Sequence, residues 1–307
     1  MQVTRFKTIS EFHQFRHLPK PEHPLISVFK VESVESLKLS GPATWLYDFY
    51  CIGLKRVANA NEVKLKYGQQ TYDHDEGILS FVSPNQVLSL SIDKNAAQLK
   101  QSGWMLLVHP DFLWNMPLAG TIKHYDFWDY SVNEALFLSD REEALLVNII
   151  QNIQQECPLN IDKFSKSIIV SHLETMLNYA DRFYHRQFIT REKSSHQILE
   201  RLEKLLSDYF GNSNLISNGL PTVGHVAQSL NLSPKYLSSL LKVLTGQNTQ
   251  QHIHEKLIEK AKEKLSTTDL SISEIAYALG FEHLQSFSKL FKTKTQLSPL
   301  EFRQSFN

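Results

Sequence analysis

The stretch SISEIAYALGFEHLQSFSKLFKTKTQLSPLEFR, residues 271–303, has the spacing of a short helix, a tight turn and a second helix. Gly280 supplies the turn, because glycine adopts backbone conformations that other residues avoid. Ala276 is small enough to let the two helices cross closely. The apolar faces of the two helices consist of Ile272, Ile275, Ala276 and Leu279, and of Phe287, Leu290 and Phe291. These features predict a helix-turn-helix unit.

The same plan occurs about fifty residues earlier, in TVGHVAQSLNLSPKYLSSLLKVLTG, residues 222–246. Asn231 and Leu232 form the turn, and Ser233 with Pro234 opens the next helix as N-cap and first helical residue. The apolar faces consist of Val223, Val226, Ala227 and Leu230, and of Leu237, Leu240 and Leu241. Two copies in register predict two helix-turn-helix motifs, at residues 222–243 and 271–294.

The second helix of each motif carries a polar stripe opposite its apolar one. Ser, Gln and Lys side chains donate to base edges or phosphates, so each stripe has the chemistry of a recognition helix in a DNA major groove. For one copy alone, a helical pair with a solvated outer face is an equal alternative, and the duplication favours DNA binding. The candidate DNA-binding residues are Lys235, Tyr236, Ser238, Ser239 and Lys242 in the first motif, and His283, Gln285, Ser286, Lys289 and Lys292 in the second.

Residues 271–303 resemble the C-terminal signature of the AraC/XylS-type transcription regulators. The similarity lies in the Gly280-Phe281 turn, the Phe287/Phe291 pair and the helix start at Ser298-Pro299. The first motif ends in Thr245-Gly246 as members of the family do, but has Ser238-Ser239 where members often carry larger polar or basic side chains. The stretch QHIHEKLIEKAKEKL, residues 251–265, resembles the linker helix of the family, with Leu257, Ala261 and Leu265 in phase.

The resemblance covers residues 200–307 and implies a sequence-specific transcription regulator that binds double-stranded DNA through two recognition helices in successive major grooves. It also implies a response to a small-molecule effector, a homodimer and contact with RNA polymerase.

Residues 25–130 alternate apolar runs with turn clusters, which predicts an all-β unit. Together with the DNA-binding end, this unit resembles the cupin-like effector domain of many AraC-type proteins. The predicted fold class is therefore α+β, with an N-terminal cupin-like β domain, a helical linker and a C-terminal all-α domain. The domain boundaries are expected at residues 1–135, 136–195 and 196–307.

Residues 139–210 have helical patterns. Ser139 and Glu142 fit a capping box at the start of the first helix. The next helix has a wide apolar stripe, which is either a dimer contact, as the resemblance implies, or packing within the chain. The stripe consists of Phe164, Ile168, Ile169, Leu173, Met176, Leu177 and Ala180. The polar segment TREKSSH, residues 190–196, is expected to form a flexible boundary.

Five aromatic residues of the β unit are candidates for an effector pocket, since such pockets are mostly apolar with a few polar anchors. Packing in the hydrophobic core is the favoured alternative for each residue. The candidates are Trp45, Tyr47, Phe49, Phe81 and Trp104.

No residues are predicted to be metal ligands or catalytic groups, and no cofactor is expected. The histidines do not form a strand-borne His-x-His pair, which would direct two imidazoles to one side. The histidines considered are His13, His17, His74, His109, His124, His252 and His254. Asp73, Asp75 and Glu76 fit a turn better than an acid/base pair. A cupin-type metalloenzyme with a DNA-binding tail is the alternative function.

The chain has 307 residues, two cysteines and a formal net charge of zero. Residues 221–307 contain ten basic and seven acidic residues, a charge of +3 that leaves −3 on residues 1–220. DNA affinity is therefore expected to depend on a local patch and on salt. The sequence contains neither a long apolar run nor a secretion signal, so we expect no membrane span and a cytoplasmic location.

Overall fold

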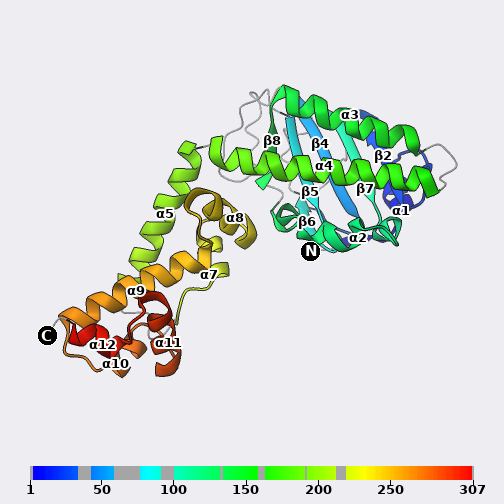
Figure 1. Cartoon of the computed structure of the whole chain (residues 1–307). Helices are drawn as coiled ribbons and strands as arrows, with labels where there is room; N and C mark the ends of the chain where they lie inside the picture. Colours follow the sequence, from blue (N-terminus) through cyan, green and yellow to red (C-terminus); the bar gives the residue numbers. More distant parts are fainter. Residues whose placement is uncertain are drawn as a thin grey trace. The chain divides into compact units, whose positions relative to one another are not determined.

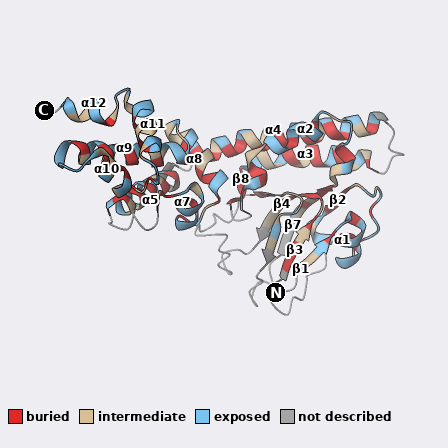
Figure 2. Cartoon of the chain, turned by 90° about the horizontal axis from the view of Figure 1, so that it is seen from below, coloured by how far each residue is buried: buried red, intermediate tan, exposed pale blue. Residues whose placement is uncertain are grey.

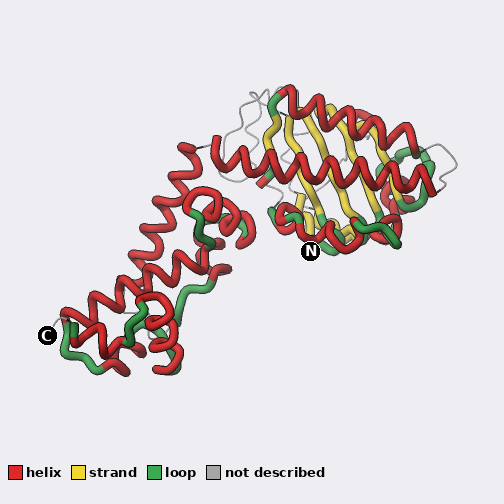
Figure 3. Tube along the Cα trace, in the orientation of Figure 1, coloured by secondary structure: helices red, strands yellow, loops and turns green. Residues whose placement is uncertain are grey.

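The computed structural model describes residues 3–33, 43–58, 77–90, 100–131, 134–157, 163–190, 192–211 and 219–305. The chain divides into two compact units, Met1–Gln187 and Phe188–Asn307. Strands lie in the first unit, whereas the described elements of the second are helices (Figure 3). The α+β fold class expected from the sequence is confirmed.

Two sheets form the framework of the first unit. The larger, antiparallel sheet has the order β2 (Ile26–Lys30), β7 (Lys100–Val108), β4 (Tyr50–Ala58), β5 (Gly77–Val82) and β8 (Leu136–Leu138). The smaller sheet has the order β1 (Val3–Phe6), β3 (Ala43–Tyr47) and β6 (Val87–Leu90), with β1 parallel to β3. In β7, a Cβ atom on Gly103 would lie 2.1 Å from the Leu54 carbonyl oxygen of the paired strand β4, so this close approach of the two backbones requires glycine.

An aromatic core lies on one face of the larger sheet. Side chains alternate between the faces of a strand, so Cys51 of β4 joins this core, whereas Tyr50 and Ile52 point to the opposite face. The core includes Phe6, Phe12, Trp45, Tyr47 and Phe49. Its helix, α1 (Ile9–Phe15), begins with a capping box from Thr8 and Glu11. Neither β1 nor α1 was predicted from the sequence.

Helices cover the opposite face of the larger sheet. Figures 1 and 2 show α3 (Asp140–Glu156) and α4 (Lys163–Thr190) lying across this face, with β1 and β3 on the other side. The capping box of Ser139 and Glu142 at the start of α3 is confirmed. The helical region predicted as a separate linker at 136–195 therefore packs largely as part of the first unit.

The prediction that β structure extends to residue 130 is wrong for the segment after β7. This segment forms four short helices: η3 (Pro110–Leu113), α2 (Leu118–Thr121), η4 (Ile122–His124) and η5 (Asp126–Asp129). Pro110 has no N–H to continue a strand ladder, and the His109 side chain accepts a hydrogen bond from the Asp111 N–H. Both features start a helical turn.

Most of the apolar stripe of α4 packs within its own unit. Leu173, Met176 and Leu177 are buried, whereas Phe164 is 64% and Ile168 42% exposed. Near the end of α4, the Gln187 side chain accepts a hydrogen bond from the Phe137 N–H at 2.8 Å and donates one to the Ala135 carbonyl. The amide of Gln187 thus takes the place of a neighbouring strand beside β8.

The second unit is helical throughout its described elements. It contains α5 (Glu192–Gly211), α7 (Val223–Ser229), α8 (Pro234–Thr245), α9 (Thr249–Thr267), α10 (Ile272–Ala278), α11 (Leu284–Thr295) and α12 (Pro299–Gln304). The flexible boundary predicted at 190–196 is instead largely helical, with residue 191 outside the described residues. The buried Ser195 hydroxyl donates to the Phe188 carbonyl at 3.0 Å, which stabilises this start of α5. Among the described residues, no helix is long and apolar enough to cross a membrane.

Candidate nucleic-acid interface

The first helix-turn-helix motif consists of α7 and α8. Thr222 caps α7 by accepting a hydrogen bond from the His225 N–H at 3.1 Å. The turn depends on Asn231, whose φ of 57° lies in the left-handed region that asparagine tolerates better than most residues. Ser233 then caps α8, as predicted, and Ala227 is fully buried where the helices meet. The turn predicted at Asn231 and the N-cap predicted at Ser233 are therefore confirmed.

The second motif consists of α10 and α11 and repeats this geometry with different residues. Ser271 and Glu274 form a capping box at the start of α10. Gly280 makes the turn with a φ of 85°, and Ala276 is fully buried. The N-cap of α11 is His283, whose side chain makes no capping hydrogen bond within the described unit.

The two motifs differ in their cores. Aromatic rings form a continuous chain through the second motif, in which Phe287 lies 5.4 Å from Phe281 and 5.8 Å from Phe291, centroid to centroid. Phe291 in turn contacts Phe302 of α12 at 5.4 Å. Leu237 and Leu241 occupy the corresponding core of the first motif. Aromatic rings bury more area than leucine and add pairwise ring contacts.

One helix joins the motifs. Helix α9 has 19 residues and begins with a capping box from Asn248 and Gln251. Its length is about 28 Å at 1.5 Å per residue. The residues predicted to be in phase, Leu257, Ala261 and Leu265, are buried. A capped, packed helix holds its ends at a fixed separation.

The polar stripe of α11 is open to solvent along its whole length. All five predicted DNA-binding residues of the second motif, His283, Gln285, Ser286, Lys289 and Lys292, are exposed. They provide ring and amide nitrogens, a hydroxyl and two ammonium groups, which are donors and acceptors of the kinds that contact base edges and phosphates.

The predicted stripe of α8 is only partly available. Lys235 and Lys242 are exposed, as expected. Tyr236, however, is only 7% exposed, and its ring packs edge-on against Phe188 at 5.2 Å. The prediction that Tyr236 faces DNA is therefore wrong, because burial of its ring in the core of the second unit removes it from the outer face.

The two serines of α8 are half-buried. The Ser238 hydroxyl hydrogen-bonds the hydroxyl of Thr249, a fully buried residue of α9, at 2.9 Å. This bond ties α8 to the joining helix, which is a structural role that the sequence pattern did not reveal. Ser239 has short reach from its half-buried position, so neither serine extends from α8 as the α11 side chains do.

Two further features of the interface, the exposed Lys294 and the buried Thr249, were not predicted from the sequence. Lys294 of α11 is exposed and adds a third ammonium group to this helix beyond Lys289 and Lys292. Burial lowers the pKa of His254 in α9, and the positive charge of Lys294 lowers it further. The continuing basic sequence after Lys292 was the available signal. Thr249 follows Asn248, a capping residue, and its burial had no sequence signal.

Charge is nearly balanced along α9, which has four lysines and three glutamates, whereas α11 has three lysines and no acidic residue. Lys256 pairs with Glu259 at 2.8 Å, and Lys260 with Glu263 at 2.7 Å. The hydrogen bond from Lys260 lowers the pKa of the Glu263 carboxyl. Since these lysines are offset by carboxylates, the local excess of positive charge predicted from composition lies on the recognition helices.

The five aromatic residues predicted to line an effector pocket are all buried. Trp45, Tyr47 and Phe49 belong to the aromatic core, whereas Phe81 packs on Phe127 at 4.3 Å. The Lys30 ammonium lies 5.5 Å from the Trp104 ring centroid. These positions match the alternative of core packing, which the sequence also allowed.

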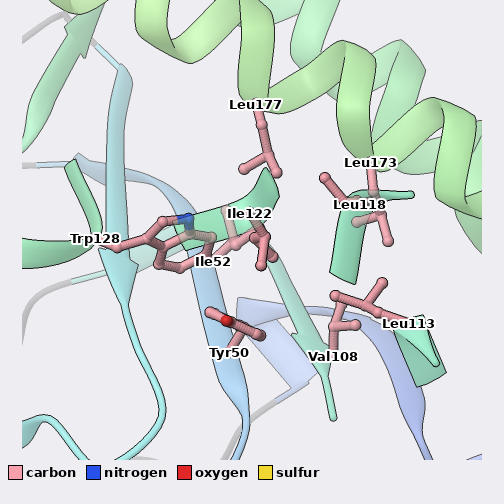
Figure 4. A pocket seen from close by; sticks show the side chains of 9 residues that line it. All are labelled: Tyr50, Ile52, Val108, Leu113, Leu118, Ile122, Trp128, Leu173 and Leu177. Atoms are coloured by element: carbon pink, nitrogen blue, oxygen red, sulfur yellow. The ribbon is translucent and has the colours of Figure 1, made fainter. Parts of the chain in front are cut away.

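A hollow in the first unit has a different lining. It lies between β4, β7 and α4, is apolar and partly open to solvent, and has a cavity volume of about 10 Å³ (Figure 4). Its lining consists of Tyr50, Ile52, Val108, Leu113, Leu118, Ile122, Trp128, Leu173 and Leu177. This volume is far below the 300–1,000 Å³ typical of small-molecule sites.

His13 has hydrogen-bond partners on both ring nitrogens within the first unit. His13 Nδ1 donates to the Pro19 carbonyl at 2.6 Å, and its Nε2 accepts from the Ser27 hydroxyl at 2.9 Å. Across the described residues, no group of three potential metal ligands occurs. His74, Asp73, Asp75 and Glu76 lie outside the described residues.

Comparison with known proteins identifies the helical unit. Residues 226–305 match the family described as a helix-turn-helix domain. The chain is 26% identical over 239 residues to an HTH-type transcriptional regulator, YfiF, of Bacillus subtilis, with 75% of this chain and 73% of that protein covered. It is 35% identical over 98 residues to the arabinose operon regulatory protein of Escherichia coli, with 32% of each chain covered.

Among solved structures, the C-terminal domain of the two-component response regulator yesN from Fusobacterium nucleatum is 32% identical, with 34% of this chain and 95% of that chain covered and a TM-score of 0.30. For several curated relatives, the match spans a third or less of their length. The second unit is thus a DNA-binding domain of the helix-turn-helix class. The resemblance of this unit to the AraC/XylS-type transcription regulators, stated from the sequence, is confirmed.

Proposed function

We propose that the whole chain is a sequence-specific, DNA-binding transcription regulator that acts in the cytoplasm and has no catalytic activity. The observation that supports this most directly is the pair of helix-turn-helix motifs held by one packed helix, with exposed polar side chains on α11. The relatives described above are transcription regulators. A stoichiometric transition metal in purified protein would instead favour the cupin-type metalloenzyme.

The two recognition helices are proposed to enter successive major grooves on one face of DNA. Successive major grooves are about 34 Å apart. The joining helix α9, about 28 Å long, keeps the motifs at a separation of this order. Bound DNA should therefore show two protected blocks about one helical turn apart.

Selection of DNA from random oligonucleotides, followed by footprinting of the selected site, tests this function. We expect one enriched sequence and two protected blocks. Recovery of random sequence alone, or a single short block that persists when residues 271–307 are removed, would contradict the proposal.

The first unit is proposed to sense a small effector or to assemble the protein as a homodimer. For the homodimer, the exposed part of the α4 stripe, Phe164 and Ile168, is the favoured contact surface. Exposed Trp114 lies nearby, because the Lys166 ammonium of α4 donates to the Trp114 carbonyl at 3.0 Å. Apolar groups gathered on a surface favour association.

The dimer can be tested by comparing full-length protein with a fragment that begins at Phe188. The fragment includes Phe188 because this residue is buried against Tyr236 of the second unit. On a paired DNA site the fragment should bind on the order of 10²-fold more weakly than the full chain, since it lacks the gain from linked half-sites. Equal affinities on the paired site would argue against dimerisation through the first unit, and loss of any effector response should accompany the truncation.

A further inference from the structure

The two recognition helices align residue for residue at an offset of 50, from Ser233 and His283 to Gly246 and Gln296. Their inner positions correspond, since Leu237 and Phe287 are buried, as are Leu241 and Phe291. Their outer positions do not correspond. The polar and exposed residues Ser286, Lys289, Thr293 and Lys294 of α11 stand where α8 has Tyr236, Ser239, Val243 and Leu244, which are buried or half-buried.

Packing against the rest of the second unit accounts for the loss of polar surface on α8. Phe188 packs on the Tyr236 ring, and Thr249 holds the Ser238 hydroxyl. Val243 and Leu244 contribute no hydrogen-bonding side chain. The long, exposed polar side chains that remain on α8 are Lys235 and Lys242, seven residues apart and so on one face of the helix.

The chemistry of the exposed side chains also differs. An ammonium group donates without accepting and acts as a point charge, so it suits phosphate and, among base edges, the O6 and N7 acceptors of guanine. The Gln285 amide both donates and accepts, and so matches the N6 and N7 edge of adenine. In the register of the two helices, Gln285 corresponds to Lys235.

We propose that α11 determines the base sequence that the protein selects, whereas α8 holds the DNA backbone without selecting bases. Gln285 and Ser286 are the proposed specificity-determining residues, and Lys235 and Lys242 the proposed phosphate contacts. This inference rests on the proposed DNA-binding function.

The test uses full-length protein and DNA selected by the wild type, with substitutions at matched positions. Gln285→Ala is paired with Lys235→Ala, and Lys292→Ala with Lys242→Ala, since the members of each pair share a helical position. Ser286→Ala tests the second proposed specificity-determining residue. Each protein undergoes a new selection and a salt titration on the wild-type site. The changed side chains are exposed, and thermal unfolding checks that each variant folds like the wild type.

We expect Gln285→Ala to lose preference at one base pair, with discrimination falling roughly 5- to 100-fold. Lys235→Ala and Lys242→Ala should select the wild-type motif, bind every sequence more weakly and lower the log–log salt slope by about 0.9 each. The inference is overturned if either α8 variant selects a different motif, or if Gln285→Ala and Ser286→Ala both select the wild-type motif. If the wild-type protein enriches no sequence, the proposed function itself is refuted. This outcome differs from the two outcomes that overturn only the inference.

Discussion

The first and second helix-turn-helix motifs reach one backbone plan with different residues. Each motif places one residue in the left-handed region at its turn and another after its second helix. The first motif uses Asn231 and Gly246 for these two places, whereas the second uses Gly280 and Gln296. The two motifs therefore share buried faces and turn conformations because packing requires them, whereas their outer faces can diverge in function.

The largest expected effect concerns the cores of the motifs. Phe287→Ala should lower the free energy of unfolding of the second unit by about 3–5 kcal/mol. The matched change Leu237→Ala should cost less, because Phe287 also loses ring contacts with Phe281 and Phe291. Denaturant titrations of the two variants compare these costs, and a greater loss for Leu237→Ala would refute the importance of the aromatic chain.

A smaller effect is expected at the bond between α8 and α9. Thr249→Val should cost about 1–3 kcal/mol, because it leaves the half-buried Ser238 hydroxyl without its partner. Adding Ser238→Ala should recover part of this loss, since both polar groups are then absent. A double-mutant cycle in thermal unfolding measures the coupling, and strictly additive losses would mean that this hydrogen bond does not stabilise the first motif.

The residues that end the two recognition helices should respond in opposite directions. Gly246→Ala should cost about 1–2 kcal/mol, because an alanine side chain strains the left-handed conformation. Gln296→Gly removes the same strain at φ 65°. This gain exceeds the cost of the greater backbone entropy of glycine in the unfolded chain, so the variant should be more stable by roughly 0.5 kcal/mol. Midpoints of urea unfolding report both changes. Destabilisation by Gln296→Gly would show that its side chain contributes more than its backbone strain costs.

The smallest expected effect is the pH dependence at the first motif. The His252 Nε2 lies 2.9 Å from the Thr245 hydroxyl, and burial lowers the pKa of His252 below 6.5. The unfolded chain therefore binds the proton more readily, so the contribution of His252 is complete above about pH 6.5 and falls as the pH decreases below it. Unfolding midpoints between pH 5 and 8 should depend less on pH in His252→Gln than in wild type. An unchanged slope would assign this dependence to other histidines.

The sequence predicted the repeated parts of the fold better than the parts that depend on distant contacts. The caps at Ser139 and Ser233 and the turns at Asn231 and Gly280 follow from local chemistry, and they are confirmed. The burial of Tyr236 could not be predicted, because it depends on Phe188, which lies 48 positions away in the sequence. The helical turns after β7 were likewise obscured by apolar residues that fit a strand equally well.

The candidate interface shows the same limit. Helical spacing placed polar residues on the outer faces of both recognition helices, and all five of the second motif are exposed. In the first motif, Ser238 has the same spacing, yet its hydroxyl is bonded to Thr249 across the helix junction. Periodicity identifies a face, whereas the tertiary contacts decide which side chains on that face remain available.

The most direct test of the division between the motifs maps sequence preference onto each of them. Gln228→Cys and Tyr277→Cys place a thiol at the same exposed position of α7 and α10, for an attached iron chelate that cleaves nearby DNA. The native Cys51 and Cys157 are buried, and burial raises the pKa of both thiols to about 12, so they should remain unlabelled. On the selected site, we expect the base pairs with the strongest preference to lie beside cleavage from position 277. Strongest preference beside cleavage from position 228 would contradict it.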